Sequence, residues 1–264
     1  MSSPRVVSSP SAPPGGEGTA LVLDGVTRRF GGLLALSGVS VILERGARLA
    51  VIGPNGAGKT TLFRLISGEM RASDGTISLF GEDVSRVSER ARARRGIART
   101  FQVSNLFADL SVLDNVRIAA QAGSSRPRRF WWPVGERDAY TIRAKEMLER
   151  VGLGTREADP VADLSHGEQR QLEIAMALVV RPRLLLLDEP AAGLSAAERK
   201  VLRQLLEDLP DGLSLVLIEH DMSLALELVD HVLCLDNGVP LAYGTPDEIR
   251  ANPAVQAVYL GRRD

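Results

Sequence analysis

The strongest constraint on the fold is the stretch GPNGAGKT at residues 53–60. It matches the pattern G-x-x-x-x-G-K-[ST], and it lies between an apolar run at residues 48–52 and a helical pattern at residues 59–67. Glycine lets the backbone turn sharply and approach phosphate oxygens, while the following helix presents its positive end. The stretch therefore predicts a nucleotide phosphate-binding loop, in preference to a plain turn between a strand and a helix.

The residues of this loop have separate expected roles. Lys59 is expected to reach the β- and γ-phosphates, Thr60 to ligate Mg²⁺, and Thr61 to add a hydroxyl contact to the α-phosphate. The remaining loop residues are expected to line the phosphates, and these are Gly53, Pro54, Asn55, Gly56, Ala57 and Gly58.

Two acidic residues follow a second buried strand pattern. Residues 184–187 are four leucines, and they lead directly into Asp188 and Glu189. In open parallel sheets, ligands bind outside the carboxyl ends of the strands. We therefore expect Asp188 in the Mg²⁺ shell and Glu189 as the base that polarises the attacking water. A simple polar end to the strand is the alternative for the pair considered alone.

Apolar strand patterns alternate with helical patterns, which predicts an α/β fold. Continuous apolar strands need cover on both faces, so the core sheet is expected to be mostly parallel. Residues 21–26 and 39–43 alternate more and predict an antiparallel β extension. Core strands are expected at residues 48–52, 184–187 and 213–218, and helices at residues 59–67, 167–180, 196–209 and 223–229.

The chain is expected to form one core with an inserted helical subdomain at about residues 86–165. This segment is rich in Arg, carries a helical pattern at residues 136–151, and contains a Pro- and Trp-bearing stretch at residues 126–135 whose role is open. Residues 1–18, crowded with Ser, Pro and Gly, predict a disordered tail. The core then spans about residues 19–85 and 166–235, and a C-terminal extension spans residues 236–264, with turn signals followed by two short helices.

Composition narrows the class of partner. The formal net charge of −1 gives no overall electrostatic footprint for nucleic acid. No apolar run approaches the roughly 20 residues of a membrane-spanning helix, so a role at a membrane requires a partner. Cys234 is expected to be a buried structural thiol. A local group of arginines is expected to form a solvated helix face, with lipid head groups or an acidic partner loop as the alternative; it comprises Arg86, Arg90, Arg92, Arg94, Arg95 and Arg99.

A further motif decides the class of nucleotide-binding protein. Residues 164–169, Leu-Ser-His-Gly-Glu-Gln, precede a helical pattern and resemble the signature motif of ABC transporter ATPases. The resemblance runs from about residue 21 to residue 261 and implies a P-loop NTPase core with the ABC ATPase fold, with ATP and Mg²⁺ as cofactors. Its elements occur in the family's order, namely Phe30, residues 53–60, Gln102, residues 164–169, the acidic pair and His220.

The resemblance also implies a site shared between two chains. In such cassettes two copies pack head to tail, so that Ser165, Gly167 and Glu168 of one chain would cover the γ-phosphate held by the loop of the other. Gly167 near the start of a helix suits an anion. Taken alone, Ser165 is simply a good helix N-cap.

Other roles follow from the same resemblance. Phe30 would stack on adenine, with core packing as its alternative. Gln102 would contact Mg²⁺ or the attacking water, and His220 would contact the γ-phosphate and help to hold Glu189. The implied catalytic residues are Glu189, His220, Gln102 and Lys59, and the implied metal ligands are Thr60, Gln102 and Asp188.

Two positions depart from the family's pattern. Ser195 stands where the family commonly has an acidic or amide residue, which puts the cross-dimer contact at that point in doubt. His166 replaces the commoner glycine at a variable position of the signature, and we expect no loss of activity from it.

Within the family, the chain resembles the cassettes of branched-chain amino-acid importers, through residues 96–102, 218–222, 243–249 and 259–261. The implied partners are transmembrane permease subunits, a second cassette that is identical or paralogous, and a solute-binding protein, with no nucleic acid. The implied location is the cytoplasmic face of the cell membrane, as a peripheral subunit. The solute itself stays open, because cassettes for urea and small amides look similar. The alternative is a soluble ABC ATPase acting on ribosomes or nucleic acid.

Overall fold

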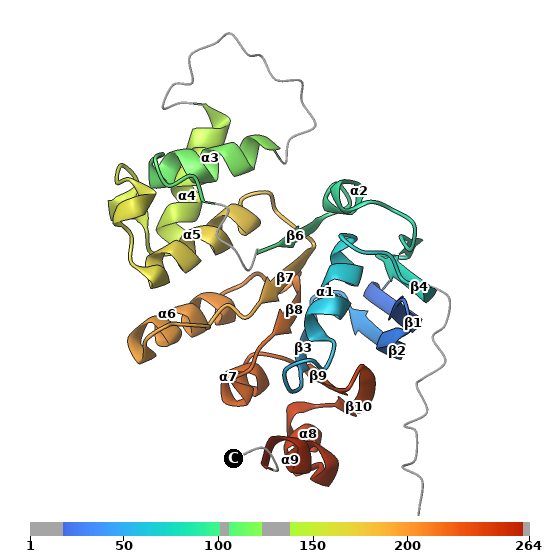
Figure 1. Ribbon diagram of the computed structural model, residues 1–264. Coiled ribbons are helices and arrows are strands. Elements are labelled where there is room, and N and C mark those ends of the chain that lie inside the picture. Colours follow the sequence, from blue (N-terminus) through green and yellow to red (C-terminus); the bar gives the residue numbers. More distant parts are fainter. Residues whose placement is uncertain (1–17, 101–105, 123–137, 261–264) are drawn as a thin grey trace, which may run out of the picture. The chain divides into compact units, whose positions relative to one another are not determined.

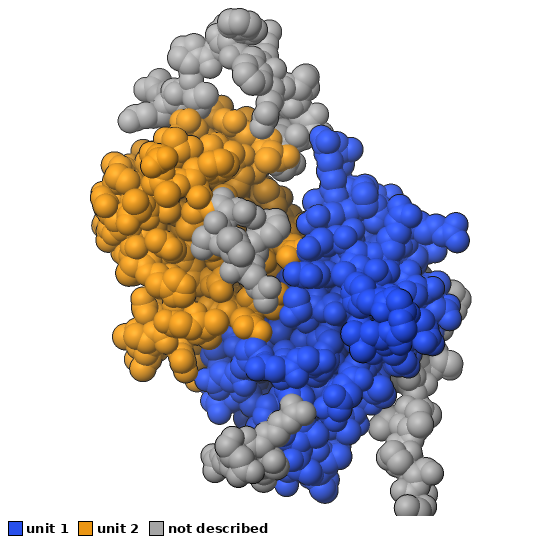
Figure 2. Space-filling view, in the orientation of Figure 1, with its two compact units in different colours: residues 1–95, 210–264 blue, residues 96–209 orange. Residues whose placement is uncertain are grey.

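The computed structural model describes residues 18–100, 106–122 and 138–260. The chain divides into two compact units, one formed by Met1–Arg95 with Pro210–Asp264 and the other by Gly96–Leu209 (Figure 2). The predicted tail lies outside the described residues except for Gly18, whose carbonyl accepts a hydrogen bond from the Arg45 N–H at 2.9 Å. The stretch at residues 126–135 also lies outside them.

The first unit contains the predicted antiparallel β extension. β1 (Thr19–Phe30) pairs antiparallel with β2 (Leu33–Glu44) on one side and with β4 (Asp74–Leu79) on the other, and β4 pairs with β5 (Glu82–Asp83) (Figure 1). Both long strands exceed the predicted ranges, because backbone pairing continues to the turn, where Phe30 is in register with Leu33.

The same unit contains the parallel strands around the phosphate loop. β3 (Arg48–Ile52) runs parallel to both β8 (Ser214–Ile218) and β9 (His231–Asp236), and β10 (Val239–Gly244) returns antiparallel to β9. α1 (Lys59–Ser67) has the bounds that the sequence predicts. After β8 this unit also contains the helices α7 (Met222–Glu227), α8 (Pro246–Ala251) and α9 (Pro253–Leu260).

An apolar cluster joins these strands to the C-terminal helices. Ala50 and Ile52 of β3 pack with Cys234 of β9, with Ile249 of α8 and with Val255 of α9. Cys234 is 0% exposed, so the prediction of a buried thiol is confirmed. The C-terminal helices therefore form part of the core that supports the loop after β3.

The second unit contains two parallel strands and several helices. β6 (Ile97–Arg99) pairs parallel with β7 (Leu184–Asp188), which is fully buried. Parallel strands in both units confirm the predicted mostly parallel α/β core. None of the described helices is long and apolar enough to cross a membrane. The helices of this unit are α3 (Val112–Ala122), α4 (Ala139–Arg150), α5 (His166–Leu178) and α6 (Ala196–Glu207), with short 3-10 turns at Gly154–Arg156 and Val161–Asp163.

Arg92, on α2 (Glu89–Ala93) of the first unit, does not lie on the solvated helix face that the sequence predicts. The sequence predicts a solvated face for the local arginines, and Arg90 is indeed exposed, but Arg92 is only 1% exposed. Its guanidinium donates to the carbonyls of Leu65 and Ile66, at 2.6 and 2.9 Å, and to that of Val84 at 2.6 Å. The last carbonyls of a helix lack partners within it, so a cation at the end of α1 satisfies them and suits the helix dipole. Burial lowers the pKa of Arg92 to about 10, and the side chain stays charged at neutral pH.

Replacing Arg92 with Met is expected to lower the free energy of unfolding by about 3–5 kcal/mol, because the carbonyls it binds would stay buried without a donor. Urea-induced unfolding followed by circular dichroism measures this change. Arg90→Met is the matched control from the same helix, with an expected change within about 0.5 kcal/mol. Equal stability of the two variants would contradict the capping role of Arg92.

Candidate functional site

The loop between β3 and α1 has the backbone that its glycines predict. Gly53 and Gly58 have φ values of 146° and 99°, where side chains are rarely tolerated. A Cβ added at Gly53 would lie 2.2 Å from the Leu235 carbonyl oxygen, and one at Gly58 would lie 2.7 Å from Leu36 Cδ2. At Gly56 no atom of the described residues lies within 4 Å of such a Cβ, so the tip of the loop is open on the part of the chain that the structure describes. The loop is thus a bare-backbone cradle that fits a phosphate group.

Lys59 is held against this loop. Its side chain is buried at 5% exposure, and Nζ donates to the carbonyls of Gly53 at 2.7 Å and Pro54 at 3.0 Å. α1 begins at Lys59 without a side-chain cap, and Thr60 and Thr61 lie half-buried in its first turn. A cation and a helix N-terminus at one loop make a site suited to an anion.

His220 lies at the same edge of the sheet as the loop. Val51 of β3 is in register with Ile218 of β8, so both strands end together and lead into the loop and into His220. His220 is exposed, and its backbone N–H donates to the Glu219 carboxylate at 3.2 Å. The first unit therefore brings two of the predicted nucleotide contacts to one edge.

Phe30 lies at the tip of the β1–β2 hairpin and is 42% exposed, so it is not core packing, which was the alternative from the sequence. The guanidinium of Arg28 lies over its ring, 4.6 Å from the centroid, and Arg28 Nη1 also donates to the Arg71 carbonyl at 2.9 Å. Further along the same hairpin, Leu36 packs at Gly58 of the phosphate loop. An accessible apolar ring on this hairpin suits a planar base.

The acidic pair ends β7 in the second unit. Asp188 is 1% exposed, and its carboxylate offers the oxygen ligands that Mg²⁺ prefers. Glu189 is half-buried and has a φ of 50°, a left-handed conformation that is uncommon outside glycine. The Thr100 N–H donates to the Leu186 carbonyl at 3.0 Å, so Thr100 lies beside the end of β7. Gln102, two residues further, lies outside the described residues.

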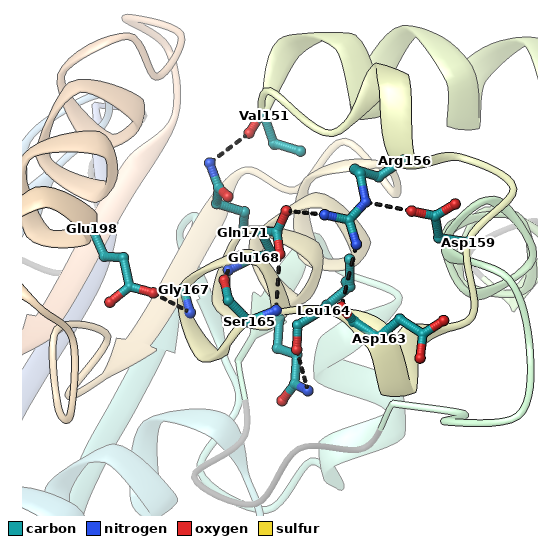
Figure 3. Close-up of polar contacts among 11 residues, drawn as sticks. Val151, Arg156, Asp159, Asp163, Leu164, Ser165, Gly167, Glu168, Gln171 and Glu198 are labelled. Atoms are coloured by element: carbon teal, nitrogen blue, oxygen red, sulfur yellow. Dashed lines mark hydrogen bonds and ion pairs between the residues drawn. The ribbon is translucent and has the colours of Figure 1, made fainter.

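Ser165 starts α5 within a polar network (Figure 3). Its Oγ accepts from the Glu168 N–H at 3.2 Å, and the Glu168 carboxylate accepts from the Ser165 N–H at 2.8 Å, which is a capping box. Arg156 Nη1 donates to the same carboxylate at 2.7 Å, while its Nε is bound to Asp159. These contacts fix the start of α5, the helix that contains signature residues 166–169.

The Gly167 N–H already binds a negatively charged oxygen. It donates to Glu198 Oε1 at 3.0 Å, and a Cβ at Gly167 would lie 2.4 Å from that atom (Figure 3). Hydrogen bonds from Ser195 lower the pKa of Glu198, which forms a second capping box with Ser195 at the start of α6. The unusual Ser195 therefore acts as a helix cap. The start of α5 accepts an anion, as the helix dipole predicts.

Arg156, Arg170 and Glu198 are not among the site residues predicted from the sequence. The Ser-x-x-Glu spacing at residues 165–168 and 195–198 is a recognisable capping signal, so the two capping boxes could have been found. Arg156 binds a residue 12 positions away, and Arg170 binds carbonyls 19 and 20 positions away. Such tertiary contacts leave no local pattern.

Known proteins resemble this chain over most of its length. Residues 36–192 match the family described as ABC transporter, and residues 239–264 match the one described as Branched-chain amino acid ATP-binding cassette transporter. The high-affinity branched-chain amino acid transport ATP-binding protein BraF of Pseudomonas aeruginosa is 40% identical across 91% of this chain and 97% of its own length. LivG of Escherichia coli, which has the same description, is 38% identical with the same coverage. The ADP conformation of MJ1267, an ATP-binding cassette of an ABC transporter, has a TM-score of 0.82 at 28% identity, covering 92% of this chain and 99% of that chain.

Proposed function

The chain belongs to the family of ABC transporter ATP-binding cassettes, and from that premise we propose that it hydrolyses ATP to power the import of branched-chain amino acids through separate membrane subunits. The proposed solute class rests on the match of residues 239–264 to the family described as Branched-chain amino acid ATP-binding cassette transporter. Support comes from BraF and LivG, which are named for transport of these amino acids and align over nearly their whole length.

The first unit would hold the nucleotide. The open backbone of residues 53–58 and the buried Lys59 would bind the phosphates, with Thr61 on the α-phosphate. Phe30 would stack on adenine, and His220 would reach the γ-phosphate. Thr60, Gln102 and Asp188 would hold Mg²⁺, which neutralises charge on the phosphate oxygens when it is bound.

Glu189 would polarise the attacking water, with His220 and Gln102 holding the water in place. Ser165, Gly167 and Glu168 would cover the γ-phosphate bound in a second cassette. This role is supported by the Gly167 N–H, which binds the Glu198 carboxylate in the isolated chain. A γ-phosphate oxygen of the second cassette would take the place of the Glu198 carboxylate at the Gly167 N–H.

The proposed partners are transmembrane permease subunits, a second cassette that is identical or paralogous, and a solute-binding protein of the same system. The proposed location is the cytoplasmic face of the cell membrane, as a peripheral subunit. The support is that the relatives are named as ATP-binding proteins of transport systems.

Deleting the gene in the source organism is expected to abolish high-affinity uptake of radiolabelled leucine, isoleucine and valine. A plasmid copy of the native gene restores uptake, and the Glu189→Gln copy does not, because binding without turnover cannot drive import. Uptake of urea and sulfate in the same cells is the matched control and stays unchanged. Normal leucine uptake with loss of another solute would refute the solute class, and recovery of the tagged chain with ribosomes instead of membranes would refute the transport role.

A further inference from the structure

Arg170, on α5 of the second unit, is bound to the main chain at Glu189. Its Nη2 donates to the Glu189 carbonyl and its Nε to the Pro190 carbonyl, both at 3.1 Å. Its Nη1 is bound to the carboxylate of Glu173, one helical turn along α5. The side chains of Arg170 and Glu173 are only 11% and 9% exposed. A largely buried guanidinium therefore joins α5 to the turn that follows β7.

The shape of the arginine side chain matters for this contact. Nε and Nη2 lie along one edge of a planar group and give two parallel N–H donors, which match two successive carbonyls. Glu173 holds Nη1 of the same group. A lysine at this position would keep the positive charge, but its single ammonium cannot reproduce the planar fork.

The carbonyls bound by Arg170 flank a strained point in the backbone. Glu189 has a φ of 50°, and a side-chain-bearing residue stays in that region only where its surroundings hold it there. The turn itself supplies one restraint, because the Ala192 N–H donates to the Glu189 carbonyl at 3.1 Å. Arg170 supplies a second restraint on the same carbonyl and also binds the next carbonyl, that of Pro190.

We propose that Arg170 is a positioning residue for ATP hydrolysis: it holds the main chain of Glu189 in the left-handed conformation that aims the Glu189 carboxylate. This inference rests on the proposed function, in which Glu189 polarises the attacking water. Arg170 lies on α5, the helix that Ser165 caps. Its contacts therefore connect Glu189 to the helix that carries the signature residues 165–168 of the same chain.

The test is the Arg170→Lys variant in a steady-state ATPase assay. The kcat is expected to fall about 10–100-fold, because a small displacement of a catalytic group is costly. The KM, the affinity for MgATP and the melting temperature are expected to stay close to native. Arg199→Lys is the matched control, since Arg199 Nε donates at 3.1 Å to the carbonyl of Leu194, which is further along the same turn. This control should keep the native kcat.

A double variant distinguishes a loss of Glu189 positioning from a loss of activity that does not involve Glu189. If Arg170 acts through Glu189, adding Arg170→Lys to Glu189→Gln causes no further loss of single-turnover hydrolysis. A further loss of about the same factor would overturn the inference, and so would an Arg170→Lys variant that fails to fold or keeps the native kcat. A native rate for Glu189→Gln alone would instead remove Glu189 as the base, which is a failure of the proposed function.

Discussion

Glu189→Gln is expected to stop steady-state ATP hydrolysis while leaving MgATP binding intact. The amide keeps the size of the side chain but cannot accept the proton of the attacking water, so kcat should fall by about 10²–10⁴-fold. Because binding survives without turnover, head-to-tail dimers should accumulate in MgATP. Phosphate release measures the rate, and size-exclusion chromatography with and without MgATP measures the dimer.

The control for this variant is Glu207→Gln, a carboxylate of the same residue type on α6 that pairs with Arg203 at 2.8 Å on the surface. It should hydrolyse ATP at the native rate. A Glu189→Gln chain that hydrolyses ATP normally, or that remains monomeric in MgATP, would count against Glu189 as the base.

Mixing two inactive variants is expected to restore ATP hydrolysis. Lys59→Ala removes the ammonium held at the phosphate loop, and Ser165→Arg places a bulky cation where the γ-phosphate must be covered. In a head-to-tail dimer the loop of the first variant faces the signature of the second, so both defects fall in one site. The other site is native. With equal amounts and independent sites, random pairing gives about a quarter of the native activity.

Two checks make the mixing result decisive. Differential tagging shows that mixed dimers form, and melting curves show that Ser165→Arg is folded after losing its helix cap. A mixture of Lys59→Ala with the native chain reports how tightly the two sites are coupled. Activity in that mixture together with inactivity of the two-variant mixture would mean that the signature does not act across the dimer.

The phosphate loop could be predicted in detail because its signals are local. Glycines at fixed positions, the apolar strand before them and the helical pattern after them give β3 and α1 with the predicted bounds. The bounds of β1 could not be predicted in the same way. That strand continues through Thr27, Arg28 and Arg29, where backbone pairing rather than an apolar side-chain pattern maintains it.

The predicted site residues follow local sequence patterns, whereas the arginines that hold the backbone around them do not. Asp188 and Glu189 are visible because they end a run of leucines, and Ser165 because it precedes a helix. Arg92 and Arg170 look like ordinary basic residues in the sequence. Arg92 is buried and Arg170 is largely buried, and each satisfies main-chain carbonyls contributed by distant segments. Such pairings depend on the folded backbone.

The rate at which a thiol reagent labels Cys234, the single cysteine of the chain, reports on local opening of the first unit. Cys234 lies in the apolar cluster behind the phosphate loop, and burial raises the pKa of its thiol to about 11. The nucleophile that attacks an alkylating reagent is the thiolate, so at neutral pH Cys234 reacts only when this core opens. The labelling rate therefore measures how often the nucleotide-binding unit unfolds locally. A nucleotide that binds only the closed form should slow the labelling in proportion to its occupancy, which gives the affinity for an unlabelled nucleotide.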